Sequence, residues 1–405
     1  MCAIYLQHTT YDIHNDCKFK CERYPVWGIS LFRLGCVDHA YNRPCNLERI
    51  FIYVVKIKRE MNVLANSLFT PYTLKDLELK NRVVMAPMCQ YSVTAKDGIP
   101  NDWHHVHYLS RAIGGTGLII IEMTDVEPDG RITDYDLGLW SDEHTPAYKK
   151  LVDGIHAHGS KVGIQIAHAG RKAEDAAVPV APSAIAYPDA NYKQPHALTT
   201  EEVRGMVRKF ADAARRAVQA GVDTIELHGA HGYLIHQFHS PVTNKRDDEY
   251  GKELSRFGVE VIQAVRKEMP AGMPLIFRIS AVEYVDGGYD VDHAIELSRA
   301  YQAAGVDVIH VSSGGEGPAG ARKPGNYPGY QVPFARQIRE ALNIPVIAVG
   351  ALDDPALAQS VIGNEDADLV AVGRGLLRDP YWATHAAVTL RGEKPFIPEQ
   401  YQRGY

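Results

Sequence analysis

The chain has 405 residues, 45% of them hydrophobic and 23% charged, and a formal net charge of −6. This length suits one large globular domain or two small ones. The acidic balance argues against non-specific nucleic-acid binding, because no basic surface would offset the phosphate charge. No apolar run approaches the ~20 residues of a membrane-spanning helix, and the chain does not open with the basic and apolar regions of a signal peptide. We therefore expect a soluble, cytoplasmic protein with no nucleic-acid or membrane partner.

The cysteines are unevenly distributed, since five lie in the first 45 residues and only Cys89 belongs to the rest of the chain. A disulfide framework is therefore not expected for the main part of the protein. Residues 1–60 also lack clear periodicity, and we expect a flexible extension or an upstream sequence that precedes a true start at Met61. A zinc site with non-standard spacing is an alternative, with the ligands Cys17, Cys21, His14 and His39.

From Met61 onward, short apolar segments alternate with amphipathic ones. The predicted strands are Arg82–Met88, Gly117–Thr124, Lys161–His168, Val222–His228, Pro274–Ser280, Val306–Ser313, Ile344–Gly350 and Ala367–Gly373. The predicted helices are Trp103–Ile113, His144–His158, a helix capped by Thr199 or Thr200, Leu254–Lys267, Asp292–Ala304, Val332–Leu342, Pro355–Ile362 and Trp382–Leu390. Leu68–Tyr72, before the first strand, is expected to form a plug or cap.

This order of elements predicts the fold. Near-continuous apolar strands indicate a parallel sheet covered on both faces, and eight β/α units in one domain indicate a (β/α)8 barrel of the TIM type, in the α/β class. No G-x-G-x-x-G sequence follows the first strand, which removes the main support for an open dinucleotide-binding sheet. We therefore expect an extension over residues 1–60 and one barrel domain with a C-terminal tail over residues 61–405.

Polar side chains interrupt three consecutive strands. Because strand side chains alternate, Gln165, His228 and Arg278 should point into the barrel and converge near the carboxyl ends of the strands, with Glu226 also inward. An Arg and a Gln there can clamp a planar ligand that becomes anionic. The last two strands end in Gly350 and in a Gly-Arg-Gly sequence, at the place where barrels commonly bind phosphate. Together these features suggest a phosphorylated planar cofactor.

The loop after the fourth strand carries His228, His231 and Tyr233. Imidazole N–H groups can hold a developing oxyanion, and a phenol can deliver a proton. The loop alone equally allows a buried, satisfied histidine pair or a metal site. A zinc-dependent lyase or isomerase could use His168 together with His228 and His231, but it would leave Gln165 and the Gly-Arg pattern without a role.

Several separate motifs resemble one family, the Old Yellow Enzymes. They are Met85–Tyr91, Ile164–Lys172, His228–His236 and Ala371–Pro380, within a resemblance that runs from about Leu68 to Tyr405. The chain looks most like the bacterial, thermophilic-like subclass that carries a Cys after the first strand and a tyrosine-arginine tail. Two departures are Met123, where relatives often have Ala, and a shorter loop after Gly251.

The resemblance implies an FMN-dependent ene-reductase (NADPH dehydrogenase) without a metal. NADPH, or NADH, would reduce the flavin and leave. An α,β-unsaturated carbonyl compound or another electron-poor alkene would then take hydride from flavin N5 on the same face and a proton from Tyr233.

The same resemblance implies roles for individual residues. The flavin site would comprise Ala86, Pro87, Met88, Cys89, Met123, Gln165, Arg278, Gly373 and Arg374, to which the strand-end pattern adds Gly350. His228 and His231 would bind the carbonyl oxygen of the substrate, and Tyr91 would shape the pocket. Arg403 resembles an arginine that reaches into a neighbouring subunit's site, which implies a homodimer or homotetramer.

Two other flavin proteins are weighed against this hypothesis. A dienoyl-CoA reductase would need an iron–sulfur cysteine cluster and a second nucleotide-binding domain, but no cysteine follows Cys89. A catalytically silent flavin-binding sensor would be expected to have lost Tyr233 or the histidine pair, and both are present.

Overall fold

The structure is a computed structural model that describes residues 17–26, 29–38, 67–318, 320, 323–325, 327–390 and 396–404. The chain divides into two compact units, Met1–Ala65 and Asn66–Tyr405.

In the first unit, two strands form an antiparallel hairpin that the sequence did not predict. They are β1 (Cys17–Val26) and β2 (Ile29–Asp38), paired from Cys17 opposite Asp38 to Val26 opposite Ile29. His14 and His39, two of the four residues of the zinc alternative, lie outside the described residues, so that alternative stays a prediction.

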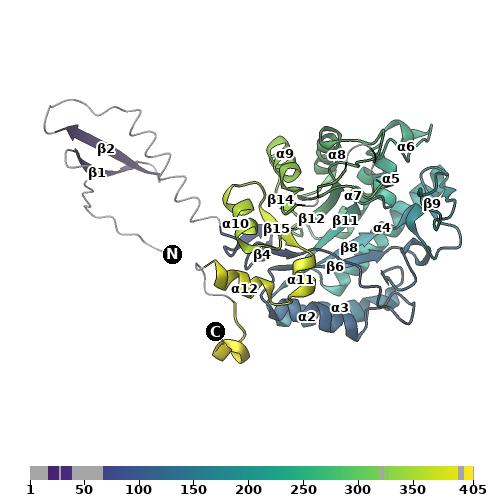
Figure 1. The fold of residues 1–405 in the computed structure, drawn as a ribbon, viewed down its shortest axis with the longest axis horizontal. Coiled ribbons are helices and arrows are strands. Elements are labelled where there is room, and N and C mark those ends of the chain that lie inside the picture. Colours follow the sequence, from purple (N-terminus) through teal and green to yellow (C-terminus); the bar gives the residue numbers. More distant parts are fainter. Residues whose placement is uncertain are drawn as a thin grey trace. The chain divides into compact units, whose positions relative to one another are not determined.

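In the second unit, parallel strands close into a barrel (Figure 1). They are β5 (Val83–Met85), β6 (Leu118–Asp125), β8 (Lys161–Ala167), β11 (Thr224–Gly229), β12 (Leu275–Ser280), β13 (Val308–Ser312), β14 (Val346–Ala348) and β15 (Leu369–Val372). Each pairs with its neighbour in this order, β15 pairs with β5, and the β5–β6 pairing closes the ring. The predicted (β/α)8 barrel is confirmed, with strand ends that differ by a few residues.

Helices surround the strands, with α2 and α3 on one side and α8 and α9 on the opposite side in Figure 1. The longer helices are α2 (Asp102–Ile113), α3 (Thr145–Ala157), α4 (Thr200–Ala220), α7 (Arg256–Glu268), α8 (Val291–Ala304), α9 (Val332–Leu342), α10 (Pro355–Gly363) and α12 (Trp382–Thr389). Thr199 caps α4, because its hydroxyl accepts from Glu202 N while the Glu202 carboxylate accepts from Thr199 N.

Shorter elements connect the main ones. They are β3 (Tyr72–Leu74), β4 (Leu77–Leu79), β7 (Leu137–Gly138), β9 (Val180–Ala181), β10 (His196–Ala197), α5 (Leu234–His239), α6 (Glu249–Lys252), α11 (Arg374–Arg378), η1 (Pro128–Gly130), η2 (Asp142–His144), η3 (Gly170–Lys172) and η4 (Glu399–Gly404). Among the described residues, no helix is long and apolar enough to cross a membrane.

The side-chain alternation of the strands separates two apolar layers. Outward residues such as Ile164, Leu227 and Phe277 belong to the large core cluster that also contains the inner faces of the helices. Inward residues such as Ile120 and Ile276 form a second cluster, which includes three leucines of the antiparallel β3–β4 hairpin: Leu74, Leu77 and Leu79. This hairpin, rather than the predicted Leu68–Tyr72, therefore supplies the apolar plug of the barrel.

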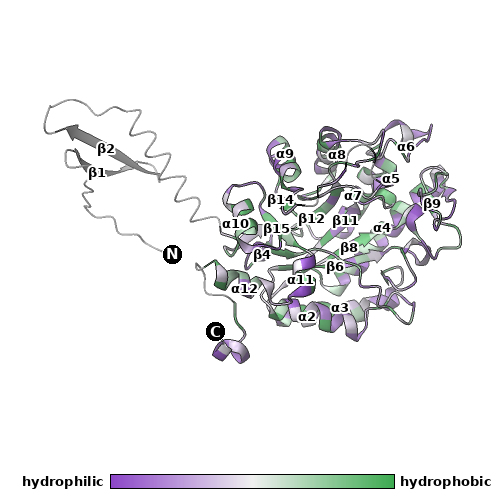
Figure 2. Ribbon diagram, viewed as in Figure 1, coloured by the Kyte–Doolittle hydropathy of each residue, from purple (hydrophilic) through white to green (hydrophobic). Residues whose placement is uncertain are grey.

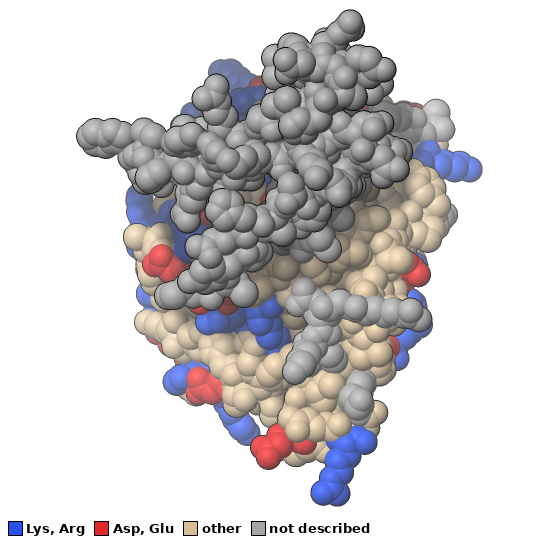
Figure 3. Space-filling model, turned by 90° about the vertical axis from the view of Figure 1, so that its left-hand side faces the viewer, with Lys and Arg blue, Asp and Glu red and all other residues tan. Residues whose placement is uncertain are grey.

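The hydropathy of the chain follows the same division. Figure 2 shows hydrophobic colour on central strands, most clearly on β8, and hydrophilic colour on the outer helix α9. On the described part of the face in Figure 3, Lys and Arg side chains lie among Asp and Glu side chains. Inside the barrel, polar residues replace apolar ones toward the carboxyl ends of the strands. Active sites of such barrels lie at these ends, so we expect the active site of this protein there.

Candidate active site

Glu226 is the centre of a buried polar network inside the barrel. Its side chain is fully buried, accepts a 2.7 Å hydrogen bond from Gln165 Nε2, and contacts His310 Nδ1 at 2.6 Å. Burial opposes ionisation of Glu226, but His310, Arg278 and Gln165 together hold its pKa below the usual value. The carboxylate therefore orients the Gln165 amide.

Arg278 lies between two of these polar strands. It is opposite His228 on β11 and opposite His310 on β13. Only 8% of Arg278 is exposed, and its Nε–H has no hydrogen-bond partner among the described residues. A buried guanidinium donor without a partner is costly unless a ligand accepts from it. Gln165 and Arg278 therefore offer a hydrogen-bonding edge suited to a planar, electron-rich ligand.

The two loop histidines are neutral and fixed in defined tautomers. Burial, and then the charge of Arg278, lower the pKa of His228 and of His231 well below the usual value. Ala230 N donates to His228 Nδ1 at 3.2 Å, so the His228 proton is on Nε2. His231 Nε2 lies 2.7 Å from Ser312 Oγ. We assign the hydroxyl proton to this contact rather than to Gln331 Oε1 at 3.4 Å, which already accepts from Ser313 Oγ at 2.7 Å, and this places the His231 proton on Nδ1. The rings are 5.1 Å apart and nearly perpendicular, and each keeps one N–H for a ligand.

Tyr233 lies against this pair, with its ring centroid 4.9 Å from that of His228. Burial, and then Cys89 and Tyr91, raise the pKa of Tyr233 well above its usual value, so the phenol keeps its proton. Lys172 Nζ lies 5.0 Å from the centroid of the Tyr233 ring, and burial lowers the pKa of Lys172 to about 8. A cation over the ring favours the phenolate that forms when Tyr233 gives its proton away.

The segment after β5 forms another wall of the same site. Cys89 and Tyr233 both pack against one small apolar cluster that contains Met123 and Ile132. Burial raises the pKa of the Cys89 thiol well above its usual value, with Asp136 adding to the effect, so Cys89 is a thiol and not a thiolate. Ala86 and Pro87 are buried, Met88 is half-buried, and Tyr91 is 48% exposed with a left-handed backbone, φ +50°.

The ends of β14 and β15 supply the remaining predicted residues. Gly350 is buried at φ +129°, a conformation that favours glycine. Gly373 precedes α11, and Arg374, its first residue, is exposed. Burial raises the pKa of Tyr330, and both Arg374 and Arg278 oppose that shift. Arg374 therefore lies at the same end of the barrel as Arg278.

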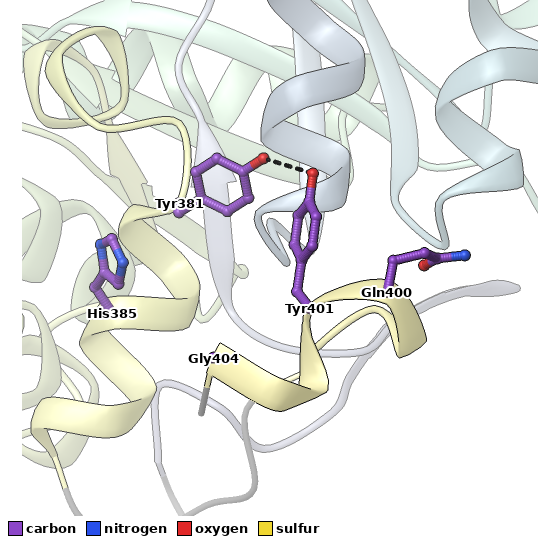
Figure 4. A pocket seen from close by; sticks show the side chains of 5 residues that line it. All are labelled: Tyr381, His385, Gln400, Tyr401 and Gly404. Atoms are coloured by element: carbon purple, nitrogen blue, oxygen red, sulfur yellow. Dashed lines mark hydrogen bonds between the residues drawn. The ribbon is translucent and has the colours of Figure 1, made fainter.

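Arg403 is not part of this group within the chain. It lies in η4 and is exposed. The neighbouring Tyr401 hydroxyl lies 3.4 Å from the Tyr381 hydroxyl beside α12, and these two tyrosines line a shallow pocket with His385, Gln400 and Gly404 (Figure 4). In the described part of the chain, Arg403 makes no hydrogen bond or ion pair with His228, His231 or Tyr233.

The zinc alternative at the barrel mouth does not fit this geometry. Both ring nitrogens of His168 are engaged, Nε2 with Glu127 at 2.7 Å and Nδ1 with Gly170 N at 2.9 Å. Within the described residues, the His, Cys, Asp and Glu side chains spaced for a metal are His236, Glu283 and Glu316, and not the three predicted histidines. His168 is therefore a structural residue.

Sequence reasoning missed several polar residues of the site. His310, Ser312 and Lys172 received no role, and Glu226 was expected inward but without a partner. His310 and Ser312 alternate with Ile309 and Val311 in β13, so the alternation that pointed to Arg278 could have found them.

We expect the histidine pair to make stability sensitive to acid. The folded state disfavours protonation of His228 and His231, whereas the unfolded chain takes up protons below about pH 6.5. Stability should therefore fall as pH drops below that value, by up to roughly 1.4 kcal/mol per pH unit for each histidine. Melting temperatures at pH 7.5 and 5.5 test this, with a His228→Asn/His231→Asn variant as comparison. An equally large fall in the variant would contradict the expectation.

Comparison with known proteins gives the family. A model of the NADH:flavin oxidoreductase / NADH oxidase family matches residues 67–393. The chain is 50% identical over 343 residues to NADPH dehydrogenase of Listeria welshimeri serovar 6b. This alignment covers 84% of the present chain and 99% of the Listeria protein.

Two solved structures are also similar. The structure of morphinone reductase superimposes on this one with a TM-score of 0.69 and 30% sequence identity. The superposition covers 80% of this chain and 90% of the morphinone reductase chain. A 2-naphthoyl-CoA reductase complex has a TM-score of 0.75 and 26% identity over 81% of this chain, but this chain spans only 52% of that one.

The chain thus belongs to the NADH:flavin oxidoreductase / NADH oxidase family, the Old Yellow Enzymes. It is an FMN-dependent oxidoreductase that takes electrons from a reduced nicotinamide. The predicted family, enzyme class and cofactor are confirmed, whereas the Cys-containing subclass stays a prediction.

Proposed function

We propose that this enzyme is an ene-reductase, which reduces the C=C bond of α,β-unsaturated carbonyl compounds and other electron-poor alkenes. The observation that carries the proposal is the arrangement of His228, His231 and Tyr233. Two neutral imidazoles, each with a fixed N–H donor, lie beside a phenol that keeps its proton. This set can bind a carbonyl oxygen and protonate a nearby carbon.

The histidine pair acts on the oxygen of the substrate. Negative charge develops on that oxygen as the β-carbon is reduced, and two preorganised N–H donors stabilise it by several kcal/mol, with about 2.7–4 kcal/mol known for one such donor. Tyr233 then gives its proton to the α-carbon, and Lys172 stabilises the resulting phenolate through the face of the ring. Tyr91 would shape the space in which the alkene lies.

The residues at the barrel mouth fit FMN. The partnerless Nε–H of Arg278 and the oriented amide of Gln165 match the hydrogen-bonding edge of a flavin ring. Ala86, Pro87, Met88, Cys89 and Met123 would line the ring, and Gly350, Gly373 and Arg374 would hold the phosphate. Bound FMN supplies the hydride for the alkene. Arg278, whose positive charge the ionised Glu226 favours, would stabilise negative charge on the reduced ring.

The reductant is proposed to be NADPH, with NADH as the other possibility. NADPH dehydrogenase is the name of the Listeria relative, and morphinone reductase has been solved in complex with tetrahydroNAD. The nicotinamide and the alkene would use the same flavin face in turn, since His228 and His231 can bind either carbonyl group.

The exposed tail supports a proposal about assembly. Arg403 is exposed in η4 and, among the described residues, has no hydrogen bond or ion pair with the site; as the resemblance implies, it would complete a neighbouring site in a homodimer or homotetramer. We also propose that the protein is located in the cytoplasm, where reduced nicotinamide is supplied. We further propose that the chain divides into an extension over residues 1–60 and a barrel domain over residues 61–405.

The visible spectrum of the purified protein tests the function directly. A yellow protein that bleaches on anaerobic addition of NADPH and recolours on addition of cyclohexenone would support both half-reactions. Bleaching without recolouring would refute the alkene assignment and direct attention to Met123 or the shorter loop after Gly251. A protein unable to take up FMN would contradict the cofactor site itself.

A further inference from the structure

A second layer of buried polar side chains lies beneath the loop that carries His231 and Tyr233. His231 and Gly232 both have left-handed backbones, with φ of +60° and +71°. A Cβ added to Gly232 would lie 2.4 Å from Gly315 O, so the loop is pressed against the segment after β13. A non-glycine residue keeps such a conformation only where its surroundings determine it.

Four side chains hold this stretch of backbone, and one of them is Ser280, whose Oγ accepts from His231 N at 3.1 Å. Gly232 N donates to His236 Nδ1 at 2.9 Å, Gln237 Nε2 donates to Gly232 O at 2.8 Å, and Lys172 Nζ donates to His231 O at 3.0 Å. The contact from Gly232 is the central one, because that residue separates His231 from Tyr233. The placement of both functional side chains therefore depends on the acceptor at His236.

A carboxylate fixes His236 as that acceptor. Since Nδ1 accepts a hydrogen bond from a backbone N–H, the proton of the imidazole is on Nε2. Nε2 lies 3.0 Å from Glu283 Oε1, and Glu283 Oε2 accepts from Tyr289 N at 2.8 Å. His236 and Glu283 are both buried. The chain of contacts thus runs from a carboxylate through an imidazole to the loop.

The same residues have the spacing of a metal site together with Glu316. A cation would need the lone pair of His236 Nε2, but the contact from Gly232 places a proton on that nitrogen. Arg171 Nη2 already donates to Glu316 Oε1 at 2.8 Å. The geometry therefore favours a hydrogen-bonded support over a metal centre.

We propose that His236 and Glu283 are positioning residues, which set the places of His231 and Tyr233 relative to the substrate. The inference rests on the proposed ene-reductase function for its kinetic consequence. It assigns the pair no contact with substrate or flavin.

The test compares three variants. His236→Leu removes the acceptor for Gly232 N, whereas His236→Asn restores one close to the position of Nδ1. His239→Leu is the matched control, because His239 lies on the same helix α5 and is equally buried. Its Nδ1 contacts the Tyr301 hydroxyl at 2.9 Å and its Nε2 contacts the Tyr289 hydroxyl at 3.3 Å, so among the described residues its hydrogen bonds reach His236 only through Tyr289 and do not reach the loop.

Two readouts separate positioning from general destabilisation. One is the Kd of 4-hydroxybenzaldehyde, an aldehyde without a reducible alkene, measured through the visible spectrum of the flavin. The other is the rate of flavin reoxidation at saturating cyclohexenone. We expect His236→Leu to weaken binding and slow reoxidation by about tenfold to a hundredfold. His236→Asn should recover most of both, and His239→Leu should lower the melting temperature similarly while leaving both nearly unchanged.

Equal losses in His236→Leu and His239→Leu, or no recovery in His236→Asn, would overturn the proposal. If His236→Leu does not fold, the ¹⁵N chemical shifts of the His236 imidazole in the wild-type protein show which ring nitrogen carries the proton. A proton on Nδ1 would overturn the proposal, because Nδ1 could then not accept from Gly232 N. A wild-type enzyme that fails to reduce cyclohexenone would refute the proposed function, whereas aldehyde binding and the imidazole tautomer would still test the positioning pair.

Discussion

Replacing Tyr233 by Phe is expected to slow flavin reoxidation by cyclohexenone by about 10²–10⁴-fold, the usual contribution of a positioned general acid. The phenol is the acid that packs directly against His228, and its pKa is raised by burial, so it carries a proton at neutral pH. The substitution removes only the hydroxyl, so packing against Met123 and Ile132 should be kept.

Stopped-flow measurement of the two half-reactions provides the check. Reduction of the flavin by NADPH should stay within a few-fold of the wild-type rate, because that step needs no proton from Tyr233. Tyr91→Phe is the matched control, as a more exposed tyrosine of the same site. Equal slowing of reoxidation in both variants would show that Tyr233 is not the proton donor.

Replacing Arg278 by Met should have the largest effect on cofactor retention and on stability. The substitution removes the donor that faces the proposed flavin, and it also removes a positive charge that helps to keep buried Glu226 ionised. A buried carboxylate with less charge compensation costs stability, although His310 and Gln165 still contact Glu226. We therefore expect a nearly colourless protein with a lower free energy of unfolding.

The ratio of flavin to protein absorbance and urea unfolding of the cofactor-free protein measure these two losses. A double variant, Arg278→Met with Glu226→Gln, separates them, because it removes the uncompensated charge and keeps an oxygen that can accept from Gln165. Stability should recover in the double variant, but flavin binding should not. Full flavin retention in Arg278→Met would contradict the assignment of Arg278 to the cofactor.

The barrel could be predicted because its signal is local. Each strand is a short apolar segment followed by an amphipathic one, and the alternation within a strand decides which side chains face inward. This sufficed to bring Gln165, His228 and Arg278 to one end of the barrel before any contact was known. The loop after the fourth strand added Tyr233 and the family motifs added Cys89 and Tyr91, which alternation alone would not have selected.

The contacts that give these residues their chemistry could not be predicted in the same way. Gln165 and His310 meet Glu226 across 61 and 84 residues of sequence, and His236 meets Glu283 across 47. The tautomers of His228, His231 and His236 follow from such contacts, and no periodicity encodes them. The helix α5, which carries His236, was also not predicted, because its six residues are too few to show a helical period.

By itself, the sequence therefore determined the barrel, the inward positions and the family, since all three depend on the order and spacing of residues along the chain. Only the tertiary structure decided which imidazole nitrogens donate, which carboxylates stay ionised, and that His168 is not a metal ligand. These properties depend on distances and burial between residues far apart in sequence, and folding alone brings those residues together.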